Sequence, residues 1–230
     1  MHPPRTIGPV STGRQRGHAA TDATDDLRRA IVEGVLRPGD PLREERLAAE
    51  LGVSRNTLRE AMRTLAHEGL IAHEANRGAR VTTPTRASVR DIYLVRRTVE
   101  PPSLRAAGPD HPAAVRMRDA VDAARAAARL GDWQAVGTAD LEFHRAIVGL
   151  NDSPRLDAVL DSILAELRLA FGAFADPEFL HAPFLDDNVV ILETFESGRG
   201  DEAAALLVEY LLRSERTLFD SPASRPATAR

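Results

Sequence analysis

Apolar residues recur at helical spacing soon after the N-terminus. Leu27, Ile31 and Val35 stand four residues apart and predict an amphipathic helix over residues 22–36. A Pro-Gly pair at residues 38–39 cannot continue a helix, so it predicts where this one has ended.

Two shorter helices and a hairpin follow. One helix is predicted over residues 44–51. Ser54 is the predicted N-cap of the next, over residues 57–65, because a serine side chain there accepts a hydrogen bond from the first turn. β-prone residues from 70 to 83 flank a turn at residues 75–78 and predict a β-hairpin.

Helical periodicity dominates from residue 87 onward, with breaks rich in Pro, Gly, Asn and Asp at residues 109–112, 131–132, 151–154, 176–177 and 198–200. We therefore predict a mainly α protein in two domains. An N-terminal winged helix-turn-helix, with three helices plus a β-hairpin wing, takes residues 21–85, and an all-α bundle of about six helices takes residues 86–220. Residues 1–20 and 221–230 are predicted to be disordered tails.

The third predicted helix has two contrasting faces. Its apolar residues share one arc of a helical wheel, and the opposite arc is polar and basic, with Arg55, Asn56 and Arg59. In the major groove Arg pairs with guanine and Asn with adenine, so this face suits base reading. Basic faces of isolated helices are more often simply solvated. DNA binding is predicted here because the helix before it and the hairpin after it supply the other parts of a winged DNA-binding unit.

Charge is divided unevenly within the net charge of -4. Residues 1–85 hold 13 Arg against 11 Asp and Glu, and residues 86–230 hold 17 against 23. This small positive excess permits DNA binding but argues against an architectural protein, which relies on many phosphate contacts. The absence of cysteine excludes disulfides and thiolate metal sites. No apolar run resembles a signal peptide or a membrane span, so we expect a soluble, cytoplasmic protein.

Asp140 and His144 fall on an otherwise apolar helix face, between Ile147 and Val148 on the wheel. A carboxylate and an imidazole on a buried face need partners, since an unpaired one costs about 1–3 kcal/mol or more. One interpretation is a hydrogen-bonded pair buried in the bundle without a metal. Another is an enzyme that uses the two residues as a metal or acid-base pair, but no nucleophile elbow, phosphate loop or full ligand set accompanies them.

A longer pattern runs from residue 36 to residue 71, comprising Leu36, Pro38, Gly39, Leu42, Glu44, Leu47, Ala48, Leu51, Gly52, Val53, Ser54, Arg55, Leu58, Arg59, Glu60, Ala61, Leu65, Glu68, Gly69, Leu70 and Ile71. It resembles the DNA-binding signature of the GntR superfamily of transcriptional regulators. The resemblance implies that the recognition helix contacts DNA through Ser54, Arg55, Asn56 and Arg59, while a wing with Arg77 and Gly78 approaches the minor groove. Asn56 departs from the Thr or Pro often found there, and the wing lacks a His-Gly pair, so the operator sequence does not follow from the resemblance.

The helical part resembles the C-terminal ligand-binding (FCD) domain of the FadR-type branch, by the polar positions Tyr93, Arg96, Glu100, Asp140, His144, Glu209 and Tyr210. In that branch an Asp, a His and two further histidines hold a divalent metal, but here Asn188 and Tyr210 stand at the two further positions. We therefore expect no bound metal and no cofactor. The expected effector pocket is lined by Asp140, His144, Asn188 and Tyr210.

Arg96 matches a family position near that pocket, where its guanidinium is suited to a carboxylate effector. The alternative is a surface salt bridge on the first bundle helix. His181 and Arg168 are further candidates. Together these features predict a ligand-responsive DNA-binding transcriptional regulator, a repressor of a nearby metabolic operon, that binds a palindromic double-stranded operator as a homodimer.

Overall fold

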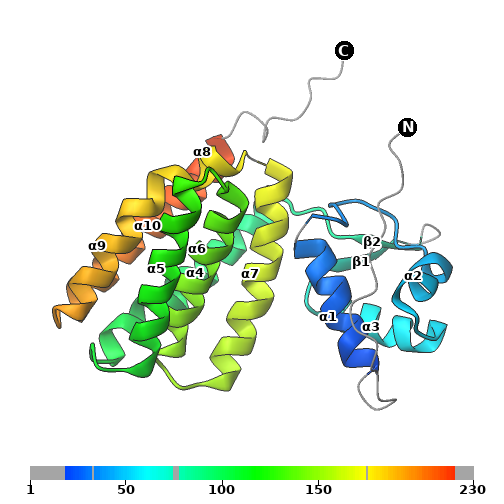
Figure 1. The fold of residues 1–230 in the computed structure, drawn as a ribbon, viewed down its shortest axis with the longest axis horizontal. Helices are drawn as coiled ribbons and strands as arrows, with labels where there is room; N and C mark the ends of the chain where they lie inside the picture. The colour runs from blue at the N-terminus through cyan, green and yellow to red at the C-terminus, as the bar shows by residue number, and fades with distance from the viewer. Residues whose placement is uncertain (1–18, 33, 75–77, 175, 221–230) are drawn as a thin grey trace. The chain divides into compact units, whose positions relative to one another are not determined.

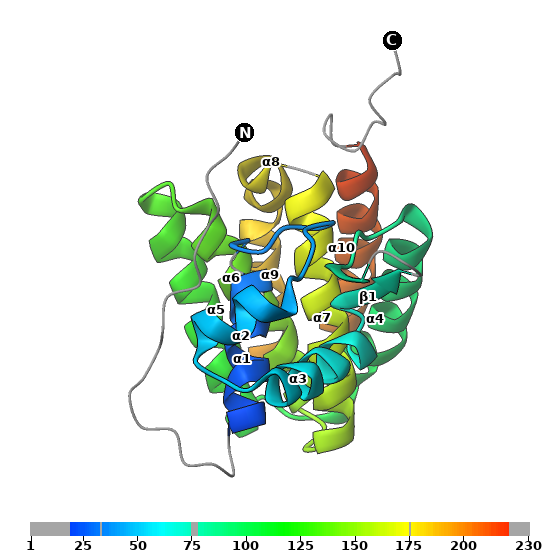
Figure 2. The same ribbon diagram turned by 90° about the vertical axis from the view of Figure 1, so that its right-hand side faces the viewer.

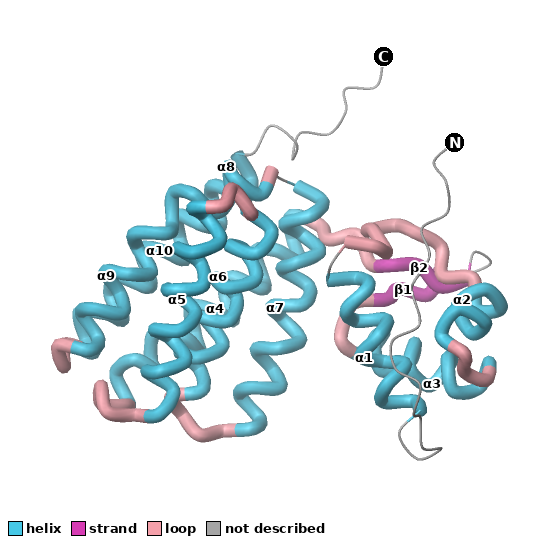
Figure 3. Tube along the Cα trace, in the orientation of Figure 1, coloured by secondary structure: helices cyan, strands magenta, loops and turns pink. Residues whose placement is uncertain are grey.

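In the computed structural model, described at residues 19–32, 34–74, 78–174 and 176–220, the chain divides into two units. The first is Met1–Pro84 with Arg168–Gly172, and the second is Thr85–Leu167 with Ala173–Arg230. Figure 3 shows that helices predominate and that the strands lie only in the first unit, within the described residues. The predicted mainly α fold, a winged helix-turn-helix followed by a helical region, is confirmed.

The first unit is built from α1 (Ala19–Val32), α2 (Glu44–Leu51), α3 (Arg55–His67), β1 (Ile71–Glu74) and β2 (Gly78–Val81), which Figure 1 labels. The two strands pair antiparallel, with Ile71 opposite Val81. α3 packs against both α1 and α2, and its buried residues join a core that includes Leu27, Ile31, Leu51, Leu58, Leu65 and Leu70. The core fixes α3 by its apolar face and leaves its other face outward.

The first helix ends earlier than the apolar spacing predicts, so the prediction that it extends to residue 36 is wrong. Gly34 has a φ of 72°, a left-handed conformation that glycine adopts without steric cost. The Leu36 N–H then donates to the Ala30 carbonyl oxygen at 2.9 Å, which closes the helix C-terminus. Val35 therefore lies beyond the helix.

Among the described residues, the second unit contains α4 (Arg86–Ala106), α5 (Pro112–Arg129), α6 (Trp133–Gly149), α9 (Leu185–Glu196) and α10 (Gly200–Asp220). It also contains most of α7 (Pro154–Phe174), whose residues Arg168–Gly172 belong to the first unit. A short α8 (Pro177–His181) and a 3-10 turn η1 (Ala182–Phe184) connect α7 to α9. The predicted breaks all fall at or beside helix ends. α4 lies along α10, and α5 lies along α6, as Figures 1 and 2 show from two sides.

Candidate functional site

Ser54 begins α3 as a capping residue, as predicted. Its backbone is extended, and its hydroxyl accepts a hydrogen bond from the Thr57 N–H at 3.1 Å. Four apolar side chains on α3 are buried, namely Leu58, Ala61, Met62 and Leu65. The cap and the buried stripe together fix which residues of α3 face outward.

Arg55, Asn56 and Arg59 are all exposed on the outward face of α3. The two arginine side chains are 61% and 55% exposed, and each pairs with a glutamate of α2. Arg55 donates to Glu45 at 2.5 Å, and Arg59 donates to Glu44 at 2.7 Å. Ion pairs this exposed contribute little stability, so both guanidinium groups are free to exchange their partners for those of a ligand.

The predicted wing is the β1–β2 hairpin. Gly78 begins β2 with a φ of 77°, a conformation that favours glycine, and its register partner is Glu74. Arg77, the other residue predicted for the wing, lies outside the described residues.

A buried polar cluster forms in the second unit, and it brings together all five residues predicted for the effector pocket. We use the term polar cluster for Arg96 and Glu100 of α4, Asp140 and His144 of α6, Asn188 of α9 and Tyr210 of α10. The burial of Asp140 and His144 that the helical wheel predicts is confirmed.

Asp140 is the acceptor for two hydrogen bonds in one half of the polar cluster. Its Oδ1 accepts a hydrogen bond from the Asn188 amide at 2.7 Å and another from the Tyr210 hydroxyl at 2.8 Å. The Nε2 of His144 lies 3.9 Å from the same oxygen, too far for a hydrogen bond. Three helices thus converge on one carboxylate oxygen.

Glu100 is the hub of the other half. Its Oε1 accepts from the Arg96 Nε at 2.6 Å, and its Oε2 lies 2.7 Å from the His144 Nδ1. Arg96 is only 1% exposed, so the surface salt bridge weighed from the sequence is wrong: the ion pair exists, but it is buried. Glu100 itself was not among the predicted pocket residues, although its place four residues after Arg96 is the spacing of a helical ion pair.

Neighbouring groups lower the pKa values of both buried carboxylates, Asp140 and Glu100. Burial alone raises the pKa of Asp140, but the His144 and His181 rings and the two hydrogen bonds outweigh it, and the pKa lies below its ordinary value. Burial is likewise outweighed at Glu100, chiefly by the Arg96 guanidinium, and its pKa is also lowered. Both groups are therefore ionised near neutral pH.

Tyr210 and Arg96 keep their protons. Burial and the Asp140 charge raise the pKa of Tyr210 well above its usual range, so its hydroxyl remains a donor. Burial lowers the pKa of Arg96, but the Glu100 charge more than reverses this. In the polar cluster, Tyr210 and Arg96 therefore stay protonated as donors, and Asp140 and Glu100 stay ionised as acceptors.

Three buried atoms of the polar cluster have no hydrogen-bond partner: Arg96 Nη2, His144 Nε2 and Asn188 Oδ1. Most buried polar atoms in proteins are paired, and unpaired ones call for an explanation. They lie on three different helices around the two carboxylates. The arrangement can therefore offer hydrogen bonds to a further group.

The side chains of the cluster do not fit a transition metal. Asn188 and Tyr210 stand where the resemblance implies two metal-ligating histidines, and both donate hydrogen bonds to Asp140, so the two further imidazole ligands of such a site are absent from the cluster. In the part of the chain that the structure describes, no group of three or more His, Asp or Glu side chains is arranged to hold a metal ion. Their hydrogen bonds supply to Asp140 the compensation that a cation would give.

Two weaker candidates differ in their placement. His181, at the end of α8, is buried and close enough to lower the pKa of Asp140. Arg168 of α7 donates from Nε to the Val32 carbonyl oxygen at 3.4 Å. A role for either residue in ligand binding stays a prediction.

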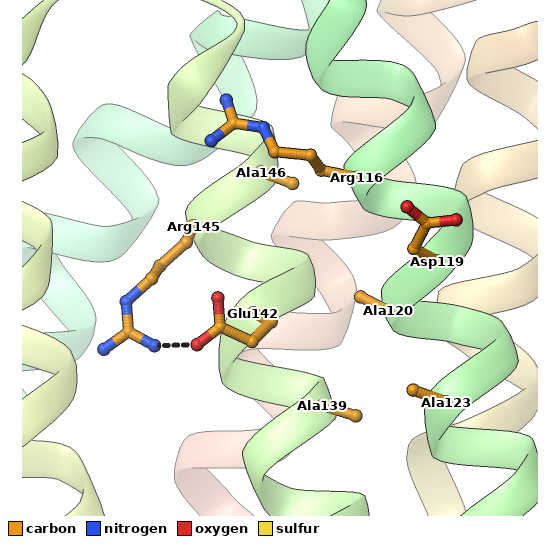
Figure 4. Close-up of a pocket in the computed structure, with 8 residues that line it drawn as sticks. All are labelled: Arg116, Asp119, Ala120, Ala123, Ala139, Glu142, Arg145 and Ala146. Atoms are coloured by element: carbon orange, nitrogen blue, oxygen red, sulfur yellow. Dashed lines mark hydrogen bonds and ion pairs between the residues drawn. The ribbon is translucent and has the colours of Figure 1, made fainter.

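An open groove of about 350 Å³ lies between α5 and α6, and none of the predicted site residues lines it (Figure 4). Its lining consists of small and charged side chains, namely Arg116, Asp119, Ala120, Ala123, Ala139, Glu142, Arg145 and Ala146. Arg145 already pairs with Glu142 at 2.5 Å and with Asp161 at 2.6 Å. The groove lacks the buried, unpaired polar atoms that distinguish the polar cluster.

Comparison with known families matches both units of the chain. Residues 19–81 match the family model described as "Bacterial regulatory proteins, gntR family", and residues 91–213 match the FCD domain. Among the described residues, no helix is both long and apolar enough to cross a membrane.

Individual relatives agree with these matches. A protein of Paenarthrobacter nicotinovorans named "Probable D-xylose utilization operon transcriptional repressor" is 32% identical over 197 residues, 85% of this chain and 87% of that protein. The HTH-type transcriptional regulator YdhC of Bacillus subtilis (strain 168) is 37% identical, but over only 33% of this chain and 34% of its own length. A crystal structure of a GntR transcriptional regulator from Rhodococcus sp. RHA1 is 38% identical, with a TM-score of 0.83, and covers 87% of this chain and 97% of that one.

Proposed function

The chain belongs to the GntR family of bacterial regulatory proteins, with a C-terminal FCD domain, and on that premise we propose that it is an operon repressor controlled by a small organic effector. As a member of this family it is a DNA-binding transcriptional regulator and not an enzyme. The proposal concerns which residues bind DNA, what the effector contacts and which genes respond.

The observation that carries the DNA-binding proposal is the outward face of α3. Arg55 and Arg59 are exposed on the face of α3 opposite its buried apolar stripe. Ser54, which follows α2 in the chain, caps the N-terminus of α3. We propose that Ser54, Arg55, Asn56 and Arg59 contact the operator, with the arginines reading guanine in the major groove. Gly78, with Arg77 beside it, belongs to the wing proposed to approach the minor groove.

A homodimer on a palindromic operator follows from the size of one recognition helix, which reads only a few base pairs. Sizing of the complex together with footprinting on the DNA upstream of the chain's own gene tests this. Two chains protecting one symmetric site are expected. A monomer on an asymmetric site would refute the dimer.

Repression of a catabolic operon is supported by the P. nicotinovorans relative, whose name describes repression of D-xylose utilization and which aligns over 85% of this chain. We propose that this chain acts in the cytoplasm on an operon for uptake or breakdown of a small carbon compound. Deletion of its gene is expected to raise transcription of that operon in the absence of inducer. Lower transcription would indicate an activator instead.

The polar cluster is the proposed effector site, because its three unpaired buried atoms offer hydrogen bonds to a ligand. The sequence favoured a carboxylate held by Arg96. However, the Nε of Arg96 is already bound to Glu100, and the buried Nη2 is without a partner. Effector binding would then favour one arrangement of the FCD helices and change the affinity for DNA, within the limit set by the effector's differential affinity for the two states.

A further inference from the structure

The chemistry of the three unpaired atoms in the polar cluster restricts what the effector can be. Arg96 Nη2 is a donor only. Asn188 gives its Nδ2 to the Asp140 carboxylate, so its unpaired Oδ1 is an acceptor. Turning the amide over would set its oxygen against that carboxylate. A ligand therefore has to donate to Asn188 and to accept from Arg96.

His144 extends this requirement. Its Nδ1 faces a Glu100 oxygen at 2.7 Å, so Nδ1 carries a proton and donates to the carboxylate. In the neutral ring Nε2 then accepts, and in the protonated ring it donates. A hydroxyl group satisfies His144 in either state, because it both donates and accepts.

A carboxylate does not meet the same requirement. It only accepts, so it leaves Asn188 Oδ1 unpaired whatever the state of His144. The charges point the same way. Arg96 is compensated by Glu100 at 2.6 Å, and Asp140 carries a second negative charge. The Arg96 charge is therefore already balanced, and a further anion beside Glu100 and Asp140 would be repelled by both carboxylates.

We infer that the effector is a neutral, hydroxyl-rich small molecule, such as an aldose or a sugar alcohol, bound directly by Arg96, His144 and Asn188. This inference rests on the proposed function, since it specifies the ligand of the proposed effector site. Each hydroxyl both donates and accepts, so one polyhydroxylated molecule can supply the acceptor for Arg96, the donor for Asn188 and a partner for the His144 imidazole. The aromatic ring of Tyr210, 5.2 Å from the His144 ring, provides apolar surface beside them.

Calorimetry with matched compounds tests the inference. The probes are D-xylose, L-arabinose, D-ribose, D-glucose and D-galactose, the sugar alcohols xylitol and D-glucitol, and the aldonates of the same five sugars, titrated into the dialysed full-length protein. At least one neutral compound is expected to bind, at least tenfold more tightly than its aldonate. A panel in which no neutral compound binds, or in which the aldonate binds more tightly, overturns the inference.

Two variants on one helix show where the ligand binds. Asn188→Leu, which removes the proposed acceptor, is expected to weaken binding of the neutral compound at least tenfold. Thr194→Val alters another buried polar residue of α9, outside the cluster, and is expected to leave binding unchanged. Thermal melts establish that both variants are folded. Equal binding by both variants would overturn the site.

The effector class and the proposed function fail in distinguishable ways. If an aldonate rather than a sugar binds and releases operator DNA, and Asn188→Leu abolishes this, the effector site stands and the class is wrong. If neither Asn188→Leu nor His144→Ala changes release of DNA by the compound that binds, the proposed site itself is wrong. Operator affinity without any ligand, measured by fluorescence anisotropy, is expected to be equal in the wild type and in the control variant Thr194→Val.

Discussion

Arginine–glutamate pairs occur in two very different settings in this protein. On the DNA-binding unit, Arg55 and Arg59 pair with glutamates of α2 while more than half of each arginine side chain remains exposed. In the FCD helices, Arg96 and Glu100 pair with both side chains almost completely buried. The distances are nearly the same, between 2.5 and 2.7 Å.

The contrast shows that burial, rather than the distance between the charges, decides whether an ion pair can exchange its partners. Water competes for the exposed pairs, which therefore exchange readily for phosphate or guanine. A buried pair cannot separate without leaving a charge in a medium of low polarity. The exposed arginines can therefore leave their glutamates to bind DNA, whereas the buried Arg96–Glu100 pair keeps its position beside the proposed effector.

Breaking the buried pair is expected to give the largest effect. Glu100→Gln leaves the Arg96 guanidinium without its counter-charge, and its single carbonyl oxygen cannot replace both carboxylate oxygens that face Arg96 and His144, so the free energy of unfolding is expected to fall by about 3–5 kcal/mol. Glu202→Gln is the matched control, because Glu202 pairs with Arg199 at 2.9 Å on the exposed surface. It is expected to cost about 0–1 kcal/mol. Urea denaturation of both variants makes the comparison, and equal costs would contradict the distinction.

Breaking the exposed pairs is expected to change DNA binding and leave stability nearly intact. Arg55→Ala and Arg59→Ala are each expected to weaken binding to the operator by about 1–3 kcal/mol if the side chain contacts a guanine. Arg46→Ala is the control, since Arg46 pairs with Glu50 on α2. Equal losses on operator and scrambled DNA would assign the arginine to phosphate, and unchanged binding by both variants would refute the recognition face.

The sequence predicted the elements of the DNA-binding unit well because local signals determine them. Ser54 is a local capping signal, and the apolar stripe of α3 is a local periodicity. The end of α1 was missed for a reason that is also local: the spacing of Val35 outweighed the left-handed turn at Gly34 in the prediction.

The polar cluster was predicted only in part. Asp140 and His144 could be placed inside the bundle from their position on an apolar face, and Asn188 and Tyr210 from the resemblance. Glu100 was missed because its role depends on contact with a residue 44 positions away. Which atoms remain unpaired depends on the packing of four helices, and no sequence pattern encodes it.

Acidification is expected to lower the free energy of unfolding by a smaller amount, through the two carboxylates of the polar cluster. In the unfolded chain Asp and Glu titrate near pH 4, and in the folded protein Asp140 and Glu100 have lowered pKa values. Their contribution to stability is therefore fully present above about pH 5 and is lost as the pH falls through the folded pKa values. Denaturation between pH 7 and pH 3 is expected to show a shallower acid decline in Asp140→Asn than in the wild type. Parallel declines would contradict the assignment.

Metal removal is expected to leave the stability of the protein unchanged. This tests whether the side chains of the polar cluster compensate the Asp140 charge without a cation. The family resemblance implies a divalent metal at Asp140 and His144, but the Asn188 amide and the Tyr210 hydroxyl both donate to Asp140 Oδ1. These two charge-assisted hydrogen bonds stabilise the carboxylate without a cation.

We therefore expect less than one equivalent of zinc, nickel or manganese in elemental analysis after dialysis, and no change in melting temperature with chelator. The double variant Asn188→His, Tyr210→His is the positive control. It replaces both donors by imidazoles, so it is expected to gain a zinc-dependent rise in melting temperature. One metal per wild-type chain, lost in His144→Ala, would show instead that ligands from elsewhere in the chain complete the site.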